Sequence, residues 1–137
     1  KFKKNIAIAA AIREALFEDR IICFYQPIVD LKTNTIAKYE TLVRMIDKNN
    51  QIIPPLDFLR IAKKTKLYSY ITKEVIRQAC KTFENRKEYF SINLSIDDIK
   101  DASTVQEIIN TIIKTKTASR IIFEILESDF ILVINIK

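Results

Sequence analysis

The sequence predicts an α/β fold in which mostly parallel strands alternate with helices. The first observation is the order of segments, because runs rich in Ile, Val and aromatic residues alternate with stretches of helical periodicity. The second is size and composition: 137 residues with 48% hydrophobic and 29% charged side chains are typical of one globular domain. The third is continuity, because no linker, repeat or low-complexity segment divides residues 1–137. We therefore treat the chain as a single domain.

The first segments predict a helix followed by two strands. A helical stripe over residues 5–19 ends in charged residues, and we assign residues 1–20 to this leading helix. An apolar strand follows over 21–31. Pro27 interrupts its pattern, and we expect an irregular or terminal stretch there because proline cannot donate to a strand ladder. A polar turn at 32–35 then leads into a second strand over 36–46. The stripe consists of Ile8, Ile12 and Leu16.

Two helices and a third strand come next. Pro54 and Pro55 are expected to open a helix over 55–64, because proline is tolerated in the first turn. A longer helix is predicted over 67–85, where apolar residues recur every four positions. These residues are Leu67, Ile71, Val75, Ala79 and Phe83. A strand over 89–95 follows.

The last segments predict a helix, a strand and a further apolar stretch. The helix covers 103–115, and Thr104 with Glu107 matches the spacing of a capping box. A strand over 120–126 precedes an apolar stretch at 130–136. The side chains expected to line one side of the helix are Val105, Ile108, Ile109, Ile112 and Ile113.

Composition excludes several classes of site. Glycine is absent, so the chain has neither a P-loop nor a glycine-rich dinucleotide fingerprint. Histidine is also absent, which excludes His-containing triads and His-ligated metals. Cys23 and Cys80 have no zinc spacing, and we expect two reduced core thiols.

Net charge and hydropathy limit which class of binding partner and which cellular location we expect. The net charge of +6 favours acidic partners, but the lysines are scattered and no aromatic-interleaved basic patch appears. We therefore expect a small anionic ligand rather than DNA or RNA. No apolar run reaches the length of about 18–20 residues that spans a bilayer. We expect a cytoplasmic domain, and its parent protein could still be tethered to a membrane.

Three polar residues stand inside otherwise apolar strands. Glu40, Asn93 and Glu124 each lie in a segment rich in Ile, Val, Leu and aromatic residues, and burying an unpaired carboxylate is costly. Strand alternation places Lys38, Glu40 and Arg44 on one face of the second strand. In a parallel barrel these polar residues would converge inside, and a hard divalent cation would compensate their charge. The residues alone leave alternatives open: Glu40 could pair with Arg44, and Asn93 could satisfy a backbone group.

Four motifs together resemble the EAL-domain family. They are residues 24–30 (FYQPIVD), 39–44 (YETLVR), 91–95 (SINLS) and 123–128 (FEILES). The resemblance implies a cyclic-di-GMP phosphodiesterase on a modified TIM barrel, dependent on Mg²⁺ or Mn²⁺. Metal-activated water would attack the phosphodiester in line and give the linear dinucleotide.

The same resemblance implies roles for individual residues. Glu40, Asn93 and Glu124 match metal ligands, and Glu40 is thereby part of the catalytic machinery. Gln26, Leu42 and Arg44 match positions that contact the dinucleotide, Arg44 through its guanidinium. Glu127 matches a glutamate that anchors a catalytic loop. Taken alone, Glu127 could instead lie in the first turn of a following helix.

The resemblance covers only the N-terminal half of the family's domain. A TIM barrel takes about 250 residues, and the family's later Asp-Asp-Phe-Gly motif and essential lysine are absent from this sequence. We expect the isolated chain to be inactive and to pair through its open half-barrel edges, for example as a homodimer. Two alternatives to an enzyme remain: a degenerate cyclic-di-GMP receptor, or a protein-interaction module.

Overall fold

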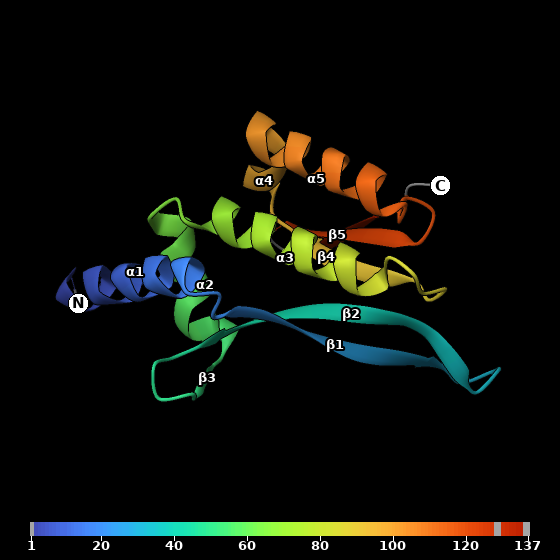
Figure 1. Cartoon of the computed structure of the whole chain (residues 1–137), viewed down its shortest axis with the longest axis horizontal. Helices are drawn as coiled ribbons and strands as arrows, with labels where there is room; N and C mark the ends of the chain where they lie inside the picture. The colour runs from blue at the N-terminus through green and yellow to red at the C-terminus, as the bar shows by residue number, and fades with distance from the viewer. Residues whose placement is uncertain (1, 128–129, 136–137) are drawn as a thin grey trace.

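A mixed sheet with helices packed against it forms the protein (Figure 1). The computed structural model describes residues 2–127 and 130–135. The helices are α1 (Phe2–Phe17), α2 (Pro55–Lys64), α3 (Tyr68–Phe83), α4 (Ile96–Lys100) and α5 (Ala102–Thr115). The strands are β1 (Ile21–Asp30), β2 (Thr35–Ile46), β3 (Ile52–Ile53), β4 (Phe90–Leu94), β5 (Ile121–Glu127) and β6 (Phe130–Asn135). The predicted α/β class is confirmed.

The sheet has the strand order β1-β2-β4-β5-β6, and β3 pairs with β2 outside this path. The central pairs β2/β4 and β4/β5 are parallel, because helices connect these strands as in βαβ units. The pairs β1/β2, β2/β3 and β5/β6 are antiparallel. The sheet is therefore parallel at its centre, as predicted, and antiparallel toward both of its edges.

Strand β1 is not interrupted at Pro27, but it is irregular close to that residue, as expected. Pro27 pairs with Tyr39 of β2, and the ladder register shifts only one residue later, between Ile28 and Val29. The strand tolerates proline because it lies at the edge of the sheet. The missing N–H donor of Pro27 is therefore tolerated because β1 has a neighbouring strand on one side only.

Helices α2 and α3 agree with their sequence patterns. Pro54 is the N-cap of α2 and Pro55 its first residue. All five residues of the predicted ladder in and before α3 are buried. Phe83 ends this ladder and stacks on Phe90 of β4, with ring centroids 4.5 Å apart. The ladder therefore packs α3 onto the sheet.

The start of α5 differs from the prediction. Asp101 is the N-cap, and Thr104 lies inside the helix with its hydroxyl donating to the Asp101 carboxylate. The capping box belongs instead to the short helix α4, where Ser95 and Asp98 exchange side chain to backbone hydrogen bonds. The predicted apolar side of α5 is also only partly correct, because Ile113 is 69% exposed.

Turns form without glycine. Asn34, in the predicted polar turn, and Asn50, in the turn between β2 and β3, take positive φ angles of 56° and 65°. Lys66 lies two residues after the end of α2, and Lys116 is the C-cap of α5. Their φ angles are 61° and 57°. Glycine commonly takes such left-handed positions because it has no Cβ. Here two lysines adopt this conformation, which is less favourable for a residue with a Cβ atom.

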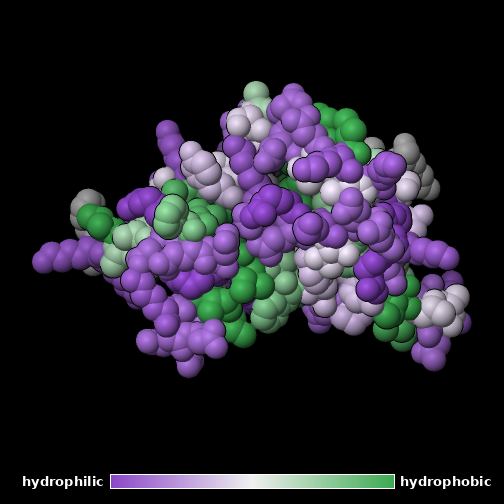
Figure 2. Space-filling view, in the orientation of Figure 1, coloured by the Kyte–Doolittle hydropathy of each residue, from purple (hydrophilic) through white to green (hydrophobic). Residues whose placement is uncertain are grey.

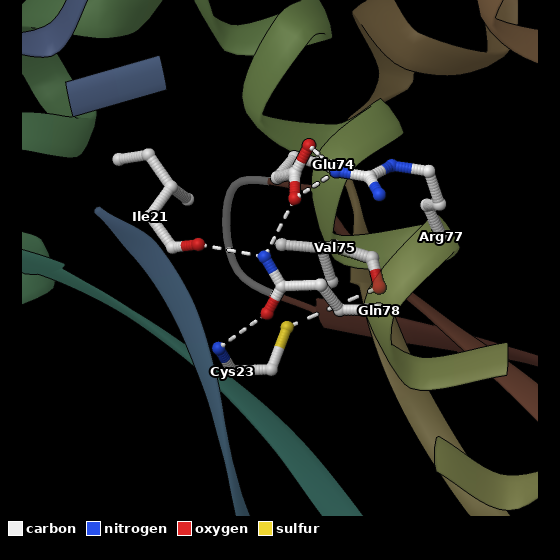
Figure 3. A network of polar contacts seen from close by, with 6 residues as sticks. All are labelled: Ile21, Cys23, Glu74, Val75, Arg77 and Gln78. Atoms are coloured by element: carbon white, nitrogen blue, oxygen red, sulfur yellow. Dashed lines mark hydrogen bonds and ion pairs between the residues drawn. The ribbon is translucent and has the colours of Figure 1, made fainter. Parts of the chain in front are cut away.

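A side-chain amide joins α3 to the beginning of β1 (Figure 3). The Gln78 Nε2 donates to the Ile21 carbonyl oxygen at 2.6 Å, and its Oε1 accepts from the Cys23 N–H at 3.1 Å. The same Nε2 also donates to the Glu74 carboxylate at 2.7 Å, and Arg77 pairs with that carboxylate. Gln78 therefore binds the backbone of β1 as a neighbouring strand would.

Both cysteines are buried free thiols, as predicted. In the described part of the chain, no helix has the length and apolar character needed to cross a bilayer.

Hydrophobic side chains remain exposed along the hairpin of β1 and β2. Leu31, in its turn, is 92% exposed, and Val29 and Ile36 are also exposed. Figure 2 shows hydrophobic surface near this end of the molecule, at the lower right, among hydrophilic residues.

Candidate functional site

Strand register places the predicted polar residues on one face of the sheet. Gln26 of β1 lies opposite Glu40 of β2, and Glu40 lies opposite Ser91 of β4. Asn93, two residues after Ser91, lies opposite Glu124 of β5. Directly paired residues, and residues two apart on one strand, share a face. The alternation in the sequence therefore predicted this face correctly.

The other face of the same strands is the core. Its buried side chains are Thr41, Met45, Phe90, Ile92, Leu94, Ile121, Phe123 and Ile125. On the polar face Asn93 is exposed, and Glu40 and Glu124 are only half-buried. The two carboxylates are therefore not fully buried, and the cost of burying an unpaired carboxylate applies to them only in part.

Glu40, Asn93 and Glu124 line one cavity of about 690 Å³. This volume lies in the range of sites for small ligands. Ser95 at the end of β4 lies on its wall with Leu94. The other wall comes from α2 and the residues around it, namely Pro55, Leu56, Leu59, Arg60, Lys63 and Tyr68. The structure therefore brings the three predicted metal ligands together.

Leu42 and Arg44 lie beside this cavity, around a smaller one of about 130 Å³ that Asn93 also lines. The Arg44 Nη1 donates to the Val43 carbonyl oxygen at 2.8 Å, and the guanidinium lies 6.0 Å from the centre of the Phe24 ring. Among the described residues, the ion pairs do not join Arg44 to Glu40. The alternative of an internal Glu40–Arg44 pair is therefore wrong.

Glu127 is the last residue of β5 and pairs with Phe130 of β6. It does not begin a helix, so that alternative is wrong. Its side chain lies outside the described part of the structure, and its role as a loop anchor stays a prediction.

The donor set at the cavity suits a hard divalent cation. Two carboxylates and one carboxamide supply oxygen ligands of the kind that Mg²⁺ and Mn²⁺ prefer. The Ser91 hydroxyl, on the same face and opposite Glu40, is buried without a hydrogen-bond partner. No group of three His, Cys, Asp or Glu side chains forms a metal cluster among the residues described. Two carboxylates and one carboxamide supply fewer ligands than the octahedral shell of Mg²⁺ needs, so the set fits a cation that keeps several water ligands.

The sequence did not point to the basic and aromatic residues that α2 and its neighbours bring to the cavity. The Lys63 Nζ lies 5.0 Å from the centre of the Tyr68 ring. Burial, followed by the nearby Asp98 carboxylate, raises the pKa of Tyr68 to about 12, so its phenol stays neutral at neutral pH. Arg60 lies three residues before Lys63, and this spacing puts both side chains on one side of α2. No motif marks these residues, because only tertiary packing turns them toward the strands.

A second unanticipated contact lies on the polar face itself. The Lys38 Nζ lies 3.5 Å from Oε1 of Glu124. Alternation had placed Lys38 on the face of Glu40. Its pairing with Glu124 depends on the strand order, because β4 lies between the strands that carry the two residues.

Comparisons with known proteins find a matching family model and similar curated proteins. The family model "EAL domain" matches residues 9–133. A probable cyclic di-GMP phosphodiesterase of Escherichia coli K12, PdeI, is 33% identical over 98 residues, which are 72% of this chain and 12% of that protein.

Solved structures show the same fold. The phosphodiesterase PaMucR, in complex with c-di-GMP, matches with a TM-score of 0.78 and 24% identity over 85% of this chain and 50% of its own. The EAL enzyme Bd1971, with cAMP and cyclic-di-GMP bound, matches with a TM-score of 0.79 and 26% identity over 88% of this chain and 36% of its own. The predicted partial EAL barrel is thereby confirmed as the fold.

The chain spans only part of these proteins: half or less of the two solved chains, and about an eighth of PdeI. Within this chain, the family model extends from the middle of α1 into β6. This protein belongs to the EAL domain family.

Proposed function

We propose that this chain is part of a metal-dependent cyclic-di-GMP phosphodiesterase domain. The observation that carries the proposal is the common cavity of Glu40, Asn93 and Glu124, which stand on three adjacent parallel strands. Membership of the EAL domain family supports the same assignment. PdeI, named a probable cyclic di-GMP phosphodiesterase, is similar over most of this chain.

The residues named as ligands would hold Mg²⁺ or Mn²⁺ through their side-chain oxygens. When bound, such a cation lowers the pKa of coordinated water and offsets negative charge on phosphoryl oxygens. Arg44 would bind a phosphate through its guanidinium, since its one described hydrogen bond uses Nη1 and leaves other N–H donors. Gln26, opposite Glu40, extends the polar surface toward β1.

The opposite wall suits the rest of a dinucleotide. Leu56 and Leu59 are apolar, and Tyr68 adds an aromatic ring with a neutral phenol. Arg60 and Lys63 bring positive charge to the same wall, which favours an anionic ligand. A cyclic dinucleotide offers both flat bases and charged phosphates, and so complements this combination.

The alternative is a cyclic-di-GMP receptor without hydrolysis. In that reading the basic residues Arg60 and Lys63 and the ring of Tyr68 would hold the dinucleotide beside the three oxygen ligands without any chemistry. We also propose that residues 1–137 by themselves hydrolyse nothing measurable, because three oxygen ligands are too few to complete a two-metal site. A role confined to protein interaction is a third reading, but it gives no reason for two carboxylates and an amide in one cavity.

The test is hydrolysis of cyclic-di-GMP by the longest natural form of the protein, with Mn²⁺ or Mg²⁺ supplied. We expect linear dinucleotide from the wild type and at least a hundredfold loss in Glu40→Gln, in line with the size of effects at charge-stabilising positions. Glu84→Gln, an exposed change beyond the end of α3, is the matched control and should keep full activity. Saturable binding with no product would establish the receptor, and neither binding nor product would refute both readings.

We also propose that the isolated chain associates with a second copy through the exposed hairpin of β1 and β2. Strand β1 is an open edge, and Val29 and Leu31 expose apolar surface beside it. Light scattering at micromolar concentration should give twice the mass of one chain for the wild type and one mass for Leu31→Lys. Phe17→Lys, an equally apolar and exposed position on α1, should leave the dimer intact. A monomeric wild type would contradict the proposal.

A further inference from the structure

Glu124, one of the three residues that face the candidate cation site, already has a positive partner from its own chain. The Lys38 Nζ lies 3.5 Å from its Oε1. Both side chains are largely shielded, with 27% of Lys38 and 20% of Glu124 exposed. Among the ion pairs of the described residues, Glu124 is the carboxylate that Lys38 contacts.

The contact bridges two strands that are not neighbours. Lys38 belongs to β2 and Glu124 to β5, and β4 runs between them. The contact runs diagonally across β4. Lys38 comes two residues before Glu40, which lies opposite Ser91 of β4, and Glu124 lies opposite Asn93, two residues after Ser91. The small side chain of Ser91 thus stands midway between the levels of the two charges.

We propose that Lys38 is a built-in counter-ion of Glu124 that competes with the divalent cation and thereby sets a low cation affinity. This inference rests on the proposed function, because it takes Glu124 as a ligand of that cation. The Lys38 ammonium group and the metal ion compete for one carboxylate, that of Glu124.

The competition follows from charge and distance. Mg²⁺ binds oxygen ligands at about 2.0–2.1 Å, so a cation of this kind must share or replace the position that the ammonium group holds beside Oε1. An ammonium that remains near would repel the incoming cation, and one that leaves gives up its ion pair. A partly shielded protein site screens such charges less than bulk water does. Either path weakens cation binding.

Lys38 is not needed to hold the strands together. Its backbone is already paired with Ile28 of β1, and the buried face of β2 is formed by Thr41 and Met45. Replacing its side chain by an uncharged one of similar length should therefore leave the fold intact. The effect on cation binding is then separable from an effect on stability.

The experiment is a Mn²⁺ titration of the full 137-residue chain, followed by the electron paramagnetic resonance signal of free Mn²⁺. We compare the wild type with Lys38→Met, which keeps the apolar stem, and with Lys38→Arg, which keeps the charge. Lys32→Met, an exposed change in the turn after β1, is the matched control. Circular dichroism and thermal midpoints verify that all variants fold.

We expect about tenfold tighter Mn²⁺ binding in Lys38→Met, which corresponds to about 1.4 kcal/mol. This gain is the size expected when one partly shielded ion pair, and the repulsion between its ammonium group and the cation, are removed. Lys38→Arg and Lys32→Met should bind as weakly as the wild type. Adding Glu124→Gln to Lys38→Met should abolish the gain, because the contested carboxylate is then gone.

Equal Mn²⁺ affinity in the wild type and in Lys38→Met would overturn the inference. If that shared affinity still falls in Glu124→Gln, the cation site of the proposed function stands and only the competition fails. If no variant binds Mn²⁺, both the inference and the proposed cation site of this chain are refuted. Cyclic-di-GMP hydrolysis is not the readout, so an inactive chain does not affect the outcome.

Discussion

Replacing Gln78 by leucine tests how the edge of the sheet is held in place. The Gln78 amide serves two backbone groups of β1, the Ile21 carbonyl and the Cys23 N–H, at 2.6 and 3.1 Å. Leucine has a similar volume but no polar atoms, so the substitution removes both of these hydrogen bonds and leaves both backbone groups without this partner. It also removes the bond from Gln78 to Glu74, whose carboxylate keeps Arg77 as a partner. Position 78 is half-buried, which limits the access of water to them.

The expected cost follows from the two unpaired groups. Each buried group that loses its partner costs about 1–3 kcal/mol, and partial hydration favours the lower half of that range. The sum is about 2–4 kcal/mol, which lowers the thermal midpoint by roughly 10 °C in a domain of this size. Urea unfolding measures the difference in the free energy of unfolding between the wild type and Gln78→Leu, provided that both have the same m-value.

A matched control separates this bridge from a general effect of glutamine loss. Gln106 on α5 donates to the Asn110 side chain at 2.9 Å, and both residues are exposed. Gln106→Leu should change the free energy of unfolding by less than about 0.5 kcal/mol. A loss in Gln78→Leu as small as that in the control would refute the reasoning, because β1 would then not depend on the side-chain amide.

Two further predictions concern strain and thiol reactivity. Lys116→Gly should stabilise the chain by about 1 kcal/mol in urea unfolding, because φ of 57° at that position suits glycine. Lys114→Gly, inside the last turn of α5, should destabilise it by about the same amount, and a Lys116→Gly variant no more stable than the wild type would contradict the strain argument. Burial raises the pKa of Cys23 to about 12 and also raises the pKa of Cys80, so both thiols stay protonated at pH 8. Ellman's reagent should therefore label them slowly in the native chain and rapidly in urea, and labelling of the native chain as fast as in urea would show that the burial is absent.

Local patterns in the sequence predicted most elements of the fold. The four-residue spacing from Leu67 to Phe83 is a strong signal, because each member packs on the same core. Alternation in β2, β4 and β5 predicted which face carries Glu40, Asn93 and Glu124. Both patterns arise from the geometry of single elements, so no knowledge of the tertiary structure is needed to detect them.

The errors have tertiary causes, as does the continuity of β1. The β1 ladder continues through Pro27 because that strand lies at a sheet edge, and edge position is not visible in the sequence. Thr104 and Glu107 have the spacing of a capping box, but Asp101 begins the helix three residues earlier. Ile113 is apolar and correctly spaced, yet it is exposed because no described element covers that side of α5.

The candidate site was predictable only in part, for the same reason. Its strand residues follow from alternation and from the family motifs. The pairing of Lys38 with Glu124 needs the order β2-β4-β5, and Lys63 reaches the cavity only through the placement of α2. Sequence patterns specify which side of a strand a residue occupies, whereas a contact between distant segments depends on how those segments pack.

The most direct test of the central claim is a crystal structure of the longest natural form grown with Mn²⁺ and cyclic-di-GMP, with anomalous scattering used to locate the metal. The account predicts an anomalous peak at about 2.0–2.3 Å from side-chain oxygens of Glu40, Asn93 and Glu124, with a phosphate of the dinucleotide beside it. A peak at other residues, or a dinucleotide bound away from this cavity, would contradict it.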